Sequence, residues 1–135
     1  MNDFHDYRPK FDFYKVCIII PTYNNETTLS QVINSVFEYT SNVLVVNDGS
    51  TDNSAIILKS FPALTVLNVS QNKGKGNALR LGFHKALEMG YKYSITIDSD
   101  GQHFPKDLPK FIDKLQECPD AIIIGARNMN QSSIP

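Results

Sequence analysis

Two aspartates stand one residue apart in the stretch IDSDGQH, residues 97–103, directly after a run typical of a β-strand. At the end of a strand, Asp98 and Asp100 can both turn toward one ligand, and Gln102 adds another oxygen donor. Such a cluster suits Mg²⁺ or Mn²⁺, which commonly retain water ligands and also bind the phosphates of a substrate. Asp, Ser and Gly are also ordinary turn residues. The stretch by itself predicts either a divalent-metal site or a turn.

Two further polar segments, NDGSTD at 47–52 and NKGKGNAL at 72–79, carry chemistry with equally plain alternatives. Asp48 at a strand end can accept bonds from a nucleobase or sugar, or simply form an Asp-Gly turn. Lys75 precedes a helix, where backbone N–H groups and the helix dipole attract phosphate. A glycine after Lys75 excludes the Walker phosphate loop. With Leu79 in place of the third glycine, the segment also matches half of a dinucleotide fingerprint, so an NAD-type oxidoreductase is a second interpretation.

Four single residues near these segments have both a functional and a structural explanation. Tyr23 can stack on a base beside Pro21, or be a half-buried aromatic with its hydroxyl in water. Glu26 can bond the same base, or complement a helix dipole. His103 can assist a metal or phosphate, or be a solvated loop residue. Arg127 can pair with phosphate, or lie on the surface.

Strand and helix patterns alternate along the chain and predict an α/β fold. Short β-branched runs predict strands at residues 16–21, 42–46, 65–69, 93–97 and 121–125. Alternation of this kind favours right-handed crossovers and a mostly parallel sheet with helices on both faces. Ligands of such sheets bind at the carboxyl ends of the strands. The segments TYNNE, NDGSTD and DSDGQH each follow a strand directly and should therefore line one rim.

The intervening helices are predicted from apolar periodicity and from their ends. The first should present Leu29, Val32, Ile33, Val36 and Phe37, with Asn24 or Asn25 as its N-cap. A short helix should end before Pro62. The next carries Leu79, Phe83, Ala86 and Leu87 and closes at Gly90, and the last begins at Pro105.

Length and composition predict one domain with few long-range electrostatic preferences. The chain has 135 residues, 41% of them hydrophobic, and 13 basic residues against 14 acidic ones. That balance argues against binding to nucleic acid or to an anionic membrane surface through overall charge. Cys17 and Cys118 form no metal-ligand pattern and are expected to be reduced. Without a signal-peptide pattern or an apolar run of membrane-spanning length, a cytoplasmic location is expected.

Five ordered segments, PTYNNE, NDGSTD, NKGKGNAL, DSDGQH and GAR, together resemble the family 2 glycosyltransferases of GT-A fold, over about residues 15–128. The form DSDGQH is most similar to the dolichol- or polyprenyl-phosphate mannosyl- and glucosyltransferase branch. The resemblance implies an inverting transfer of sugar from a nucleotide-diphosphate sugar to an acceptor. It also implies a Rossmann-like nucleotide-diphospho-sugar transferase fold.

The resemblance assigns roles to individual positions. It implies that the nucleotide's base and ribose are held by Pro21, Tyr23, Glu26 and Asp48. It implies that Lys75 and Arg127 face phosphates, that Asp98 lies beside the ribose and the metal, and that Asp100 and Gln102 ligate Mg²⁺ or Mn²⁺. A divalent ion and cationic side chains are well suited to stabilise a departing diphosphate.

The organisation of the chain limits these expectations. Residues 1–15 are predicted to be a loosely held N-terminal extension, and residues 16–135 a nucleotide-sugar-binding domain whose acceptor-binding part is absent. Any acceptor base would lie beyond Pro135. The acceptor is expected to be a lipid phosphate or a glycan, with peripheral attachment of a longer protein to the inner face of the membrane. Homo-oligomer formation and a non-catalytic nucleotide-binding or scaffold domain are the other expectations.

Overall fold

The computed structural model describes residues 3–101 and 105–117. Within them, one parallel sheet has the strand order β3-β2-β1-β4 and comprises β1 (Val16–Thr22), β2 (Val43–Asp48), β3 (Thr65–Val69) and β4 (Tyr93–Thr96). The helices are α1 (Asp3–Phe13), α2 (Leu29–Phe37), α3 (Ser54–Lys59), α4 (Lys75–Glu88), the 3₁₀ turn η1 (Pro105–Asp107) and α5 (Leu108–Glu117). The predicted alternation is confirmed. The expected strand at 121–125 and Cys118 lie outside the described residues.

The centre of the sheet is buried on both faces. Every residue of β1 and of β2 is buried, as a continuous apolar run predicts for a parallel strand covered on both sides. Side chains alternate between two apolar clusters: Ile18 and Ile20 join one, and Cys17 and Ile19 join the other. This alternation lets one short strand anchor helices on both sides.

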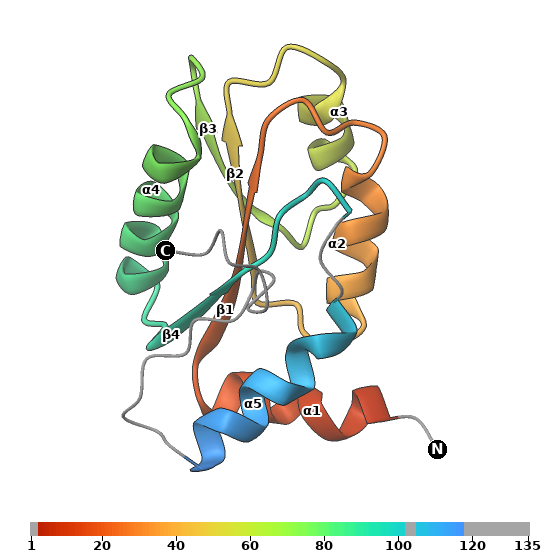
Figure 1. Ribbon diagram of the computed structural model, residues 1–135, viewed down its shortest axis with the longest axis vertical. Coiled ribbons are helices and arrows are strands. Elements are labelled where there is room, and N and C mark those ends of the chain that lie inside the picture. The colour runs from red at the N-terminus through yellow and green to blue at the C-terminus, as the bar shows by residue number, and fades with distance from the viewer. Residues whose placement is uncertain (1–2, 102–104, 118–135) are drawn as a thin grey trace, which may run out of the picture.

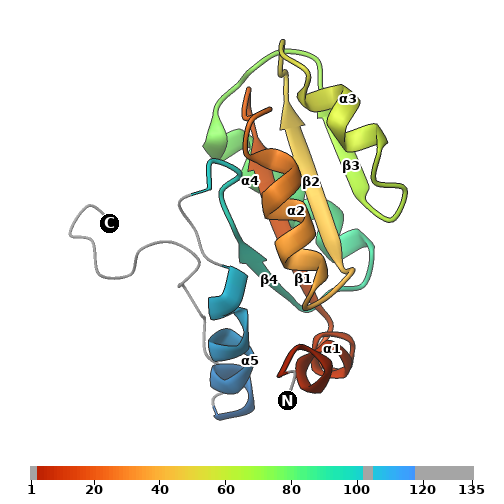
Figure 2. The same cartoon turned by 90° about the vertical axis from the view of Figure 1, so that its right-hand side faces the viewer.

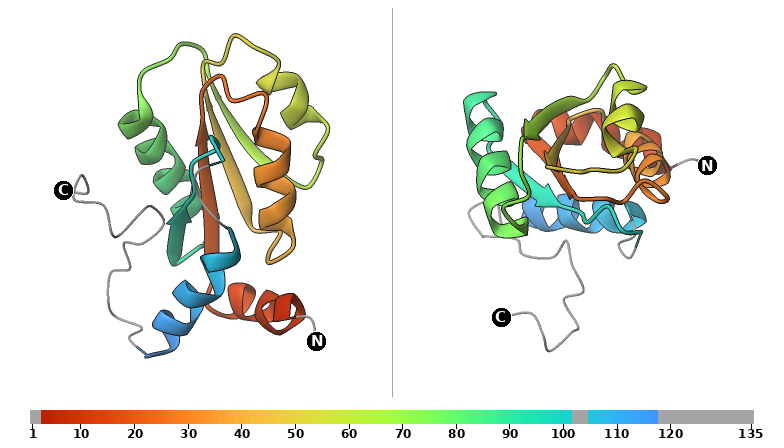
Figure 3. Two further views of the ribbon diagram at one scale, coloured as in Figure 1. Left: turned by 45° about the vertical axis from the view of Figure 1, so that its right-hand side comes forward. Right: turned by 90° about the horizontal axis from the view of Figure 1, so that it is seen from above.

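Helices cover the sheet in layers, and its two ends differ. Figure 1 shows α4 on one face and α2 and α3 on the other, and Figure 2 shows the second face. Helices α1 and α5 contact each other and lie at the end where β1 begins. The loops that follow β1, β2 and β3 meet at the opposite end, as the views in Figure 3 show. The polar segments therefore share one edge, away from α1 and α5.

Helix α4 packs on the sheet mainly through small residues, and the predicted apolar face is confirmed only in part, since Ala86 is buried and Leu79 packs partly buried against the same cluster. Its buried residues are Ala78, Gly82 and Ala86. A Cβ built at Gly82 would lie 2.8 Å from Ile19 Cγ2, so the helix backbone comes close to the strands. Phe83 and Leu87 are instead 46% and 72% exposed. With 14 residues α4 is the longest helix of the described part of the chain, in which no helix is long and apolar enough to cross a membrane.

The expectation of a loosely held N-terminal segment is wrong for the part that the structure describes. Residues 3–13 form α1, and Phe11 is fully buried in the apolar cluster. The hydroxyl of Tyr7 donates to both carboxylate oxygens of Asp113 in α5, at 3.0 and 3.1 Å. The Arg8 guanidinium donates to the carbonyl of Phe37 at the end of α2. An aromatic side chain and two polar contacts thus attach α1 to the domain.

The N-terminus of α2 also differs from the prediction. The helix begins at Leu29 with Thr28 at the N-cap position, and neither Asn24 nor Asn25 caps it. Asn24 has a left-handed φ of 53°, a conformation that asparagine tolerates better than most residues. Its side chain bonds the β2–α3 turn instead, because the chain has not yet entered the helix at that point.

Candidate functional site

A cavity of about 390 Å³ opens at the end of the sheet where β1, β2 and β4 finish and α4 begins. The residues predicted from the sequence that line it are Pro21, Tyr23, Asp48, Lys75, Asp98 and Asp100. They come from four separate segments, which the parallel sheet brings to one rim. Glu26 is exposed and does not line the cavity. Gln102, His103 and Arg127 lie outside the described residues.

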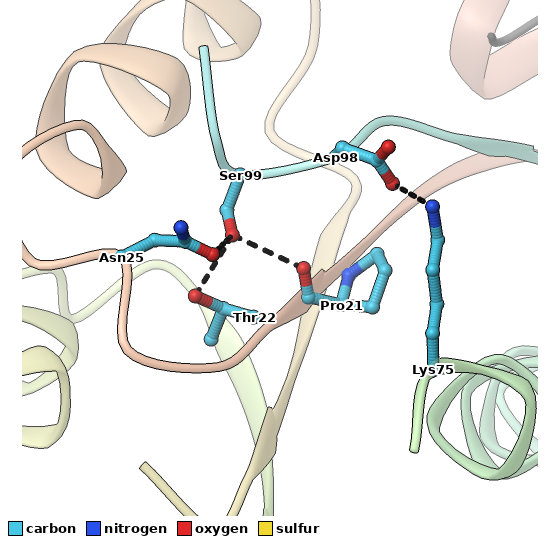
Figure 4. A network of polar contacts seen from close by, with 6 residues as sticks. All are labelled: Pro21, Thr22, Asn25, Lys75, Asp98 and Ser99. Carbon is cyan, nitrogen blue, oxygen red and sulfur yellow. Dashed lines mark hydrogen bonds and ion pairs between the residues drawn. The ribbon is translucent and has the colours of Figure 1, made fainter. Parts of the chain in front are cut away.

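An ion pair crosses this cavity. Lys75 Nζ, from the first residue of α4, lies 2.5 Å from Asp98 Oδ1 after β4 (Figure 4). The Asp98 side chain is 12% exposed, whereas that of Lys75 is 44% exposed. The Lys75 ammonium and the N–H groups of the α4 N-terminus can attract phosphate, while Asp98 offers a carboxylate on the facing side. Asp100 lines the same cavity and is exposed.

Asp48 supports the loop that leads into α4. Its two carboxylate oxygens accept hydrogen bonds from the backbone N–H groups of Lys73 and Gly74, at 3.0 and 2.9 Å. Next to it, Gly49 has a φ of +73°, and a Cβ there would lie 2.4 Å from the backbone nitrogen of Asn72. A carboxylate clamp and a close backbone approach therefore set where α4 begins. Contact between Asp48 and a nucleotide stays a prediction.

Ser99, between the two aspartates, is buried and joins the end of β4 to the end of β1. Its hydroxyl lies 2.7 Å from Asn25 Oδ1, 2.9 Å from Thr22 Oγ1 and 3.2 Å from the carbonyl oxygen of Pro21. Figure 4 shows these contacts on one side of the segment and the Lys75–Asp98 pair on the other. The hydroxyl of Thr28 donates to the Ser99 carbonyl at 2.5 Å. The segment that carries the carboxylates is therefore tied to β1.

Hydrogen bonds join the β1–α2 and β2–α3 loops. Asn24 Oδ1 accepts from the backbone nitrogens of Thr51 and Asp52, at 2.8 and 3.3 Å. Glu26 Oε1 accepts from the nitrogen of Asn53 at 2.9 Å, and the Glu26 nitrogen donates to Asp52 at 3.1 Å. Burial tends to raise the pKa of Asp52, but hydrogen bonds from Ser54 and from the nitrogen of Glu26 bring that pKa below its ordinary value. In this structure Glu26 stabilises a loop.

The oxygen donors at the cavity fit a hard divalent cation. Mg²⁺ sites commonly use one or two carboxylates and complete the coordination with water and substrate phosphates. Asp98 and Asp100 line one cavity and supply two carboxylates. Among residues 3–101 and 105–117, no group of three or more His, Cys, Asp and Glu side chains could hold a metal ion. The two aspartates would therefore need ligands from a bound phosphate and water, and the role of Gln102 stays a prediction.

The sequence patterns assigned no binding role to several residues that line the cavity, namely Thr22, Asn25, Asn72, Ala78 and Ser99. Each lies inside or beside one of the polar segments, so position relative to the strand ends is the signal that could have found them. Ser99 is uncharged and stands between two aspartates, so nothing in the sequence pattern singles it out. Asn72 can be placed only from the way its loop lies against Gly49.

Similar proteins support the fold and the branch that the motifs indicate. The chain is 31% identical to a UDP-N-acetylglucosamine–dolichyl-phosphate N-acetylglucosaminyltransferase of Methanococcus voltae, in a match covering 85% of the chain and 53% of that protein. It is 33% identical to an undecaprenyl-phosphate mannosyltransferase of Micrococcus luteus, covering 85% and 49%. The chain thus spans about half the length of these relatives. Their names confirm the predicted resemblance to the polyprenyl-phosphate branch.

The solved structures agree on the fold. Glucosyl-3-phosphoglycerate synthase from Mycobacterium tuberculosis, solved with Mn²⁺, UDP-glucose and phosphoglyceric acid, superposes with a TM-score of 0.66 at 22% identity, over 83% of this chain and 43% of that one. S. aureus TarS superposes with a TM-score of 0.60 at 25% identity, over 76% and 32%. The parallel sheet and its helices are those of the GT-A fold. A sequence model described as Glycosyl transferase family 2 matches residues 17–134, nearly the whole chain, and the chain therefore belongs to this family.

Proposed function

We propose that this chain binds the sugar donor of an inverting transferase, which moves a sugar from a UDP- or GDP-sugar to a polyprenyl phosphate. The observation that carries the proposal is the cavity at the strand ends, where Lys75, Asp98 and Asp100 converge beside the N-terminus of α4. One cation, two carboxylates and helix N-terminal N–H groups are the chemistry that a metal-bound diphosphate requires. The names of the relatives support the polyprenyl-phosphate acceptor.

Each group has a defined task in the proposed reaction. An oxygen of the acceptor phosphate attacks the anomeric carbon, the bond from that carbon to the diphosphate breaks, and the diphosphate leaves with the electron pair. Lys75 lies where it can offset the charge of the leaving group, and Asp48 keeps α4 in place. Mg²⁺ or Mn²⁺ held by Asp98 and Asp100 would neutralise part of the same charge. An acceptor that is already anionic needs no base to remove a proton.

The proposal divides the work between two parts of a longer protein. Residues 16–135 would bind the donor, and the acceptor surface would belong to the other half of the length seen in the relatives. A lipid-phosphate acceptor would bring that protein to the inner face of the membrane. Because the chain spans only about half of these relatives, a nucleotide-binding module without turnover is the second candidate function.

Isothermal titration calorimetry with UDP and with GDP tests the donor site, each in the presence and absence of Mn²⁺. We expect one nucleotide to bind, and Mn²⁺ to tighten its binding. Asp100→Asn should lower the nucleotide affinity measured with Mn²⁺ about tenfold, which is the size of effect expected when a group around a metal is lost. Asp107→Asn, in the turn before α5 and away from the cavity, is the matched control. A folded chain that releases no heat with either nucleotide would rule out donor binding.

A further inference from the structure

Ser99 stands between the two aspartates of the cavity, and its hydroxyl bonds lie on the other side of the segment from the Lys75–Asp98 pair. It is 1% exposed, and its hydroxyl points toward the end of β1 (Figure 4). Strand β4 ends at Thr96, and Ser99 and Asp100 lie in the turn that follows it, so pairing with β1 along the strand does not fix them. Asp98 and Asp100 are the direct chain neighbours of Ser99, and both line the cavity. The orientation of both carboxylates thus depends on what holds the residue between them.

Four residues of the β1 end and the following loop hold Ser99. Its hydroxyl has one proton to donate, and the shortest contact, 2.7 Å, is to Asn25 Oδ1. The hydroxyl of Thr22, 2.9 Å away, can donate to Ser99 in turn, and the Pro21 carbonyl lies at 3.2 Å. From the other side Thr28 donates to the carbonyl of Ser99 at 2.5 Å. Both the side chain and the backbone of Ser99 are therefore attached to one segment.

The attachment joins two walls of the cavity rather than two parts of the core. Pro21, Thr22 and Asn25 line the cavity on the β1 side, and Asp98 and Asp100 line it on the β4 side. The Ser99 hydroxyl is part of the hydrogen-bonded connection between these walls. A buried hydroxyl with satisfied partners specifies one arrangement, because each alternative leaves a polar group without a bond. Strand pairing holds β1 and β4 together as far as Ile97, and this contact extends their attachment to the two walls beyond the strand ends.

We propose that Ser99 is a positioning residue that keeps the carboxylates in register with the β1 wall, so that a divalent cation and a nucleoside diphosphate bind as a coupled pair. The proposal rests on the proposed donor site and adds the residue that couples its two ligands. The Ser99 hydroxyl is engaged by the β1 wall and is not assigned as a ligand of either group. It acts through Asn25 on one wall and through its two neighbours on the other.

The test uses the whole chain and measures the factor by which Mn²⁺ tightens binding of UDP or GDP, whichever binds more tightly. In Ser99→Ala this factor should fall about tenfold, as when the groups that orient metal ligands are removed. Nucleotide binding without metal should change by less than about twofold, because Ser99 is expected to affect only the coupling between the two ligands. A serine that contacted the nucleotide directly would instead weaken binding equally with and without Mn²⁺. Thr28→Val should lower the factor too. This substitution removes the hydroxyl that donates to the Ser99 carbonyl. It does not remove a helix cap, because the Thr28 side chain makes no capping bond.

Ser54→Ala is the matched control, because it removes a hydroxyl from a fully buried serine of α3 that does not line the cavity. Its Mn²⁺ factor should equal that of the unchanged chain. A folded Ser99→Ala chain with the unchanged factor would overturn the inference. If Ser99→Ala does not fold by circular dichroism, an unchanged factor in Thr28→Val overturns it. Absence of nucleotide binding in the unchanged chain rejects the proposed function, whereas normal coupled binding in all variants rejects only the role of Ser99.

Discussion

At the scale of single residues, the two carboxylates of the cavity differ in environment although they are two positions apart. The Asp98 side chain is 12% exposed and paired with Lys75, while Asp100 is exposed to solvent. The Lys75 ammonium is paired with Asp98 Oδ1. Under the proposed function, a metal that used this oxygen would compete with Lys75, and a bound diphosphate would give the ammonium another partner.

Replacing this lysine separates its two effects. In Lys75→Met we expect nucleotide affinity to fall about tenfold, since a charged contact with phosphate is lost. Mn²⁺ alone should bind more tightly, by at most about fivefold, because a partly exposed ion pair contributes about 1 kcal/mol or less. Calorimetry with UDP or GDP and with Mn²⁺ measures both. Lys73→Met removes the same charge two residues earlier, in the loop before α4 and outside the cavity lining. Equal effects of the two substitutions would contradict this role of Lys75.

At the scale of elements, the turn after β2 determines where α4 starts. Asp48 binds the loop through two backbone N–H groups, and Gly49 lets the loop approach to a distance that no side chain allows. Helix α4 then comes close to the sheet at Gly82, where a Cβ, if one were added, would lie only 2.8 Å from Ile19 Cγ2. Loop and helix together bring Lys75 to the cavity. The close approaches at Gly49 and Gly82 thus help to position Lys75.

Gly49→Ala should destabilise the chain by more than about 2 kcal/mol, because it combines a left-handed residue, about 1–2 kcal/mol, with a backbone clash. Gly90→Ala is the matched control, since Gly90 also has positive φ, +93°, but a Cβ added there would meet nothing within 4 Å. That control should cost only the left-handed strain, about 1–2 kcal/mol, without the added cost of the clash. Urea unfolding measures both free energies. Equal losses of unfolding free energy in the two variants would show that the close contact with the Asn72 backbone adds no cost at Gly49.

At the scale of the whole molecule, β1 is the strand on which every layer depends. It pairs with β2 and β4, and its side chains enter the clusters on both faces. Cys17 in this strand is 1% exposed, and burial raises the pKa of its thiol to about 12. A thiol in that position is neutral and shielded until the sheet opens. Cys17 therefore reports on unfolding of the domain.

With Cys118→Ser as the background, Cys17 should react with a thiol reagent at pH 8 at least about a thousandfold more slowly in the folded chain than in urea. Its raised pKa adds stability that is complete below the unfolded value of 9.0 and declines as the pH rises from there toward about 12. Absorbance at timed intervals follows the reaction. A rate in buffer equal to that in urea would contradict burial of β1.

Much of the fold could be predicted because it depends on local periodicity. Continuous apolar runs indicated β1 and β2, Thr65–Val69 matched β3 at both ends, and Gly90 marked the end of α4. The face of α4 was predicted correctly for Ala86 and wrongly for Phe83 and Leu87, because hydrophobicity favours the larger side chains, whereas the helix approaches the sheet most closely at a glycine. Propensity describes a helix alone, and the partner surface decides which side packs.

The amino-acid sequence by itself determined that the polar segments follow strands and must therefore meet at one end of a parallel sheet, because crossovers of one hand leave no other arrangement. Only the tertiary structure decided which groups bind one another there. Asp48 holds backbone 25 and 26 residues away, Lys75 pairs with Asp98, and Ser99 reaches a residue 74 positions earlier. Such contacts depend on how closely helices and loops approach the sheet, a distance set by packing across the whole domain.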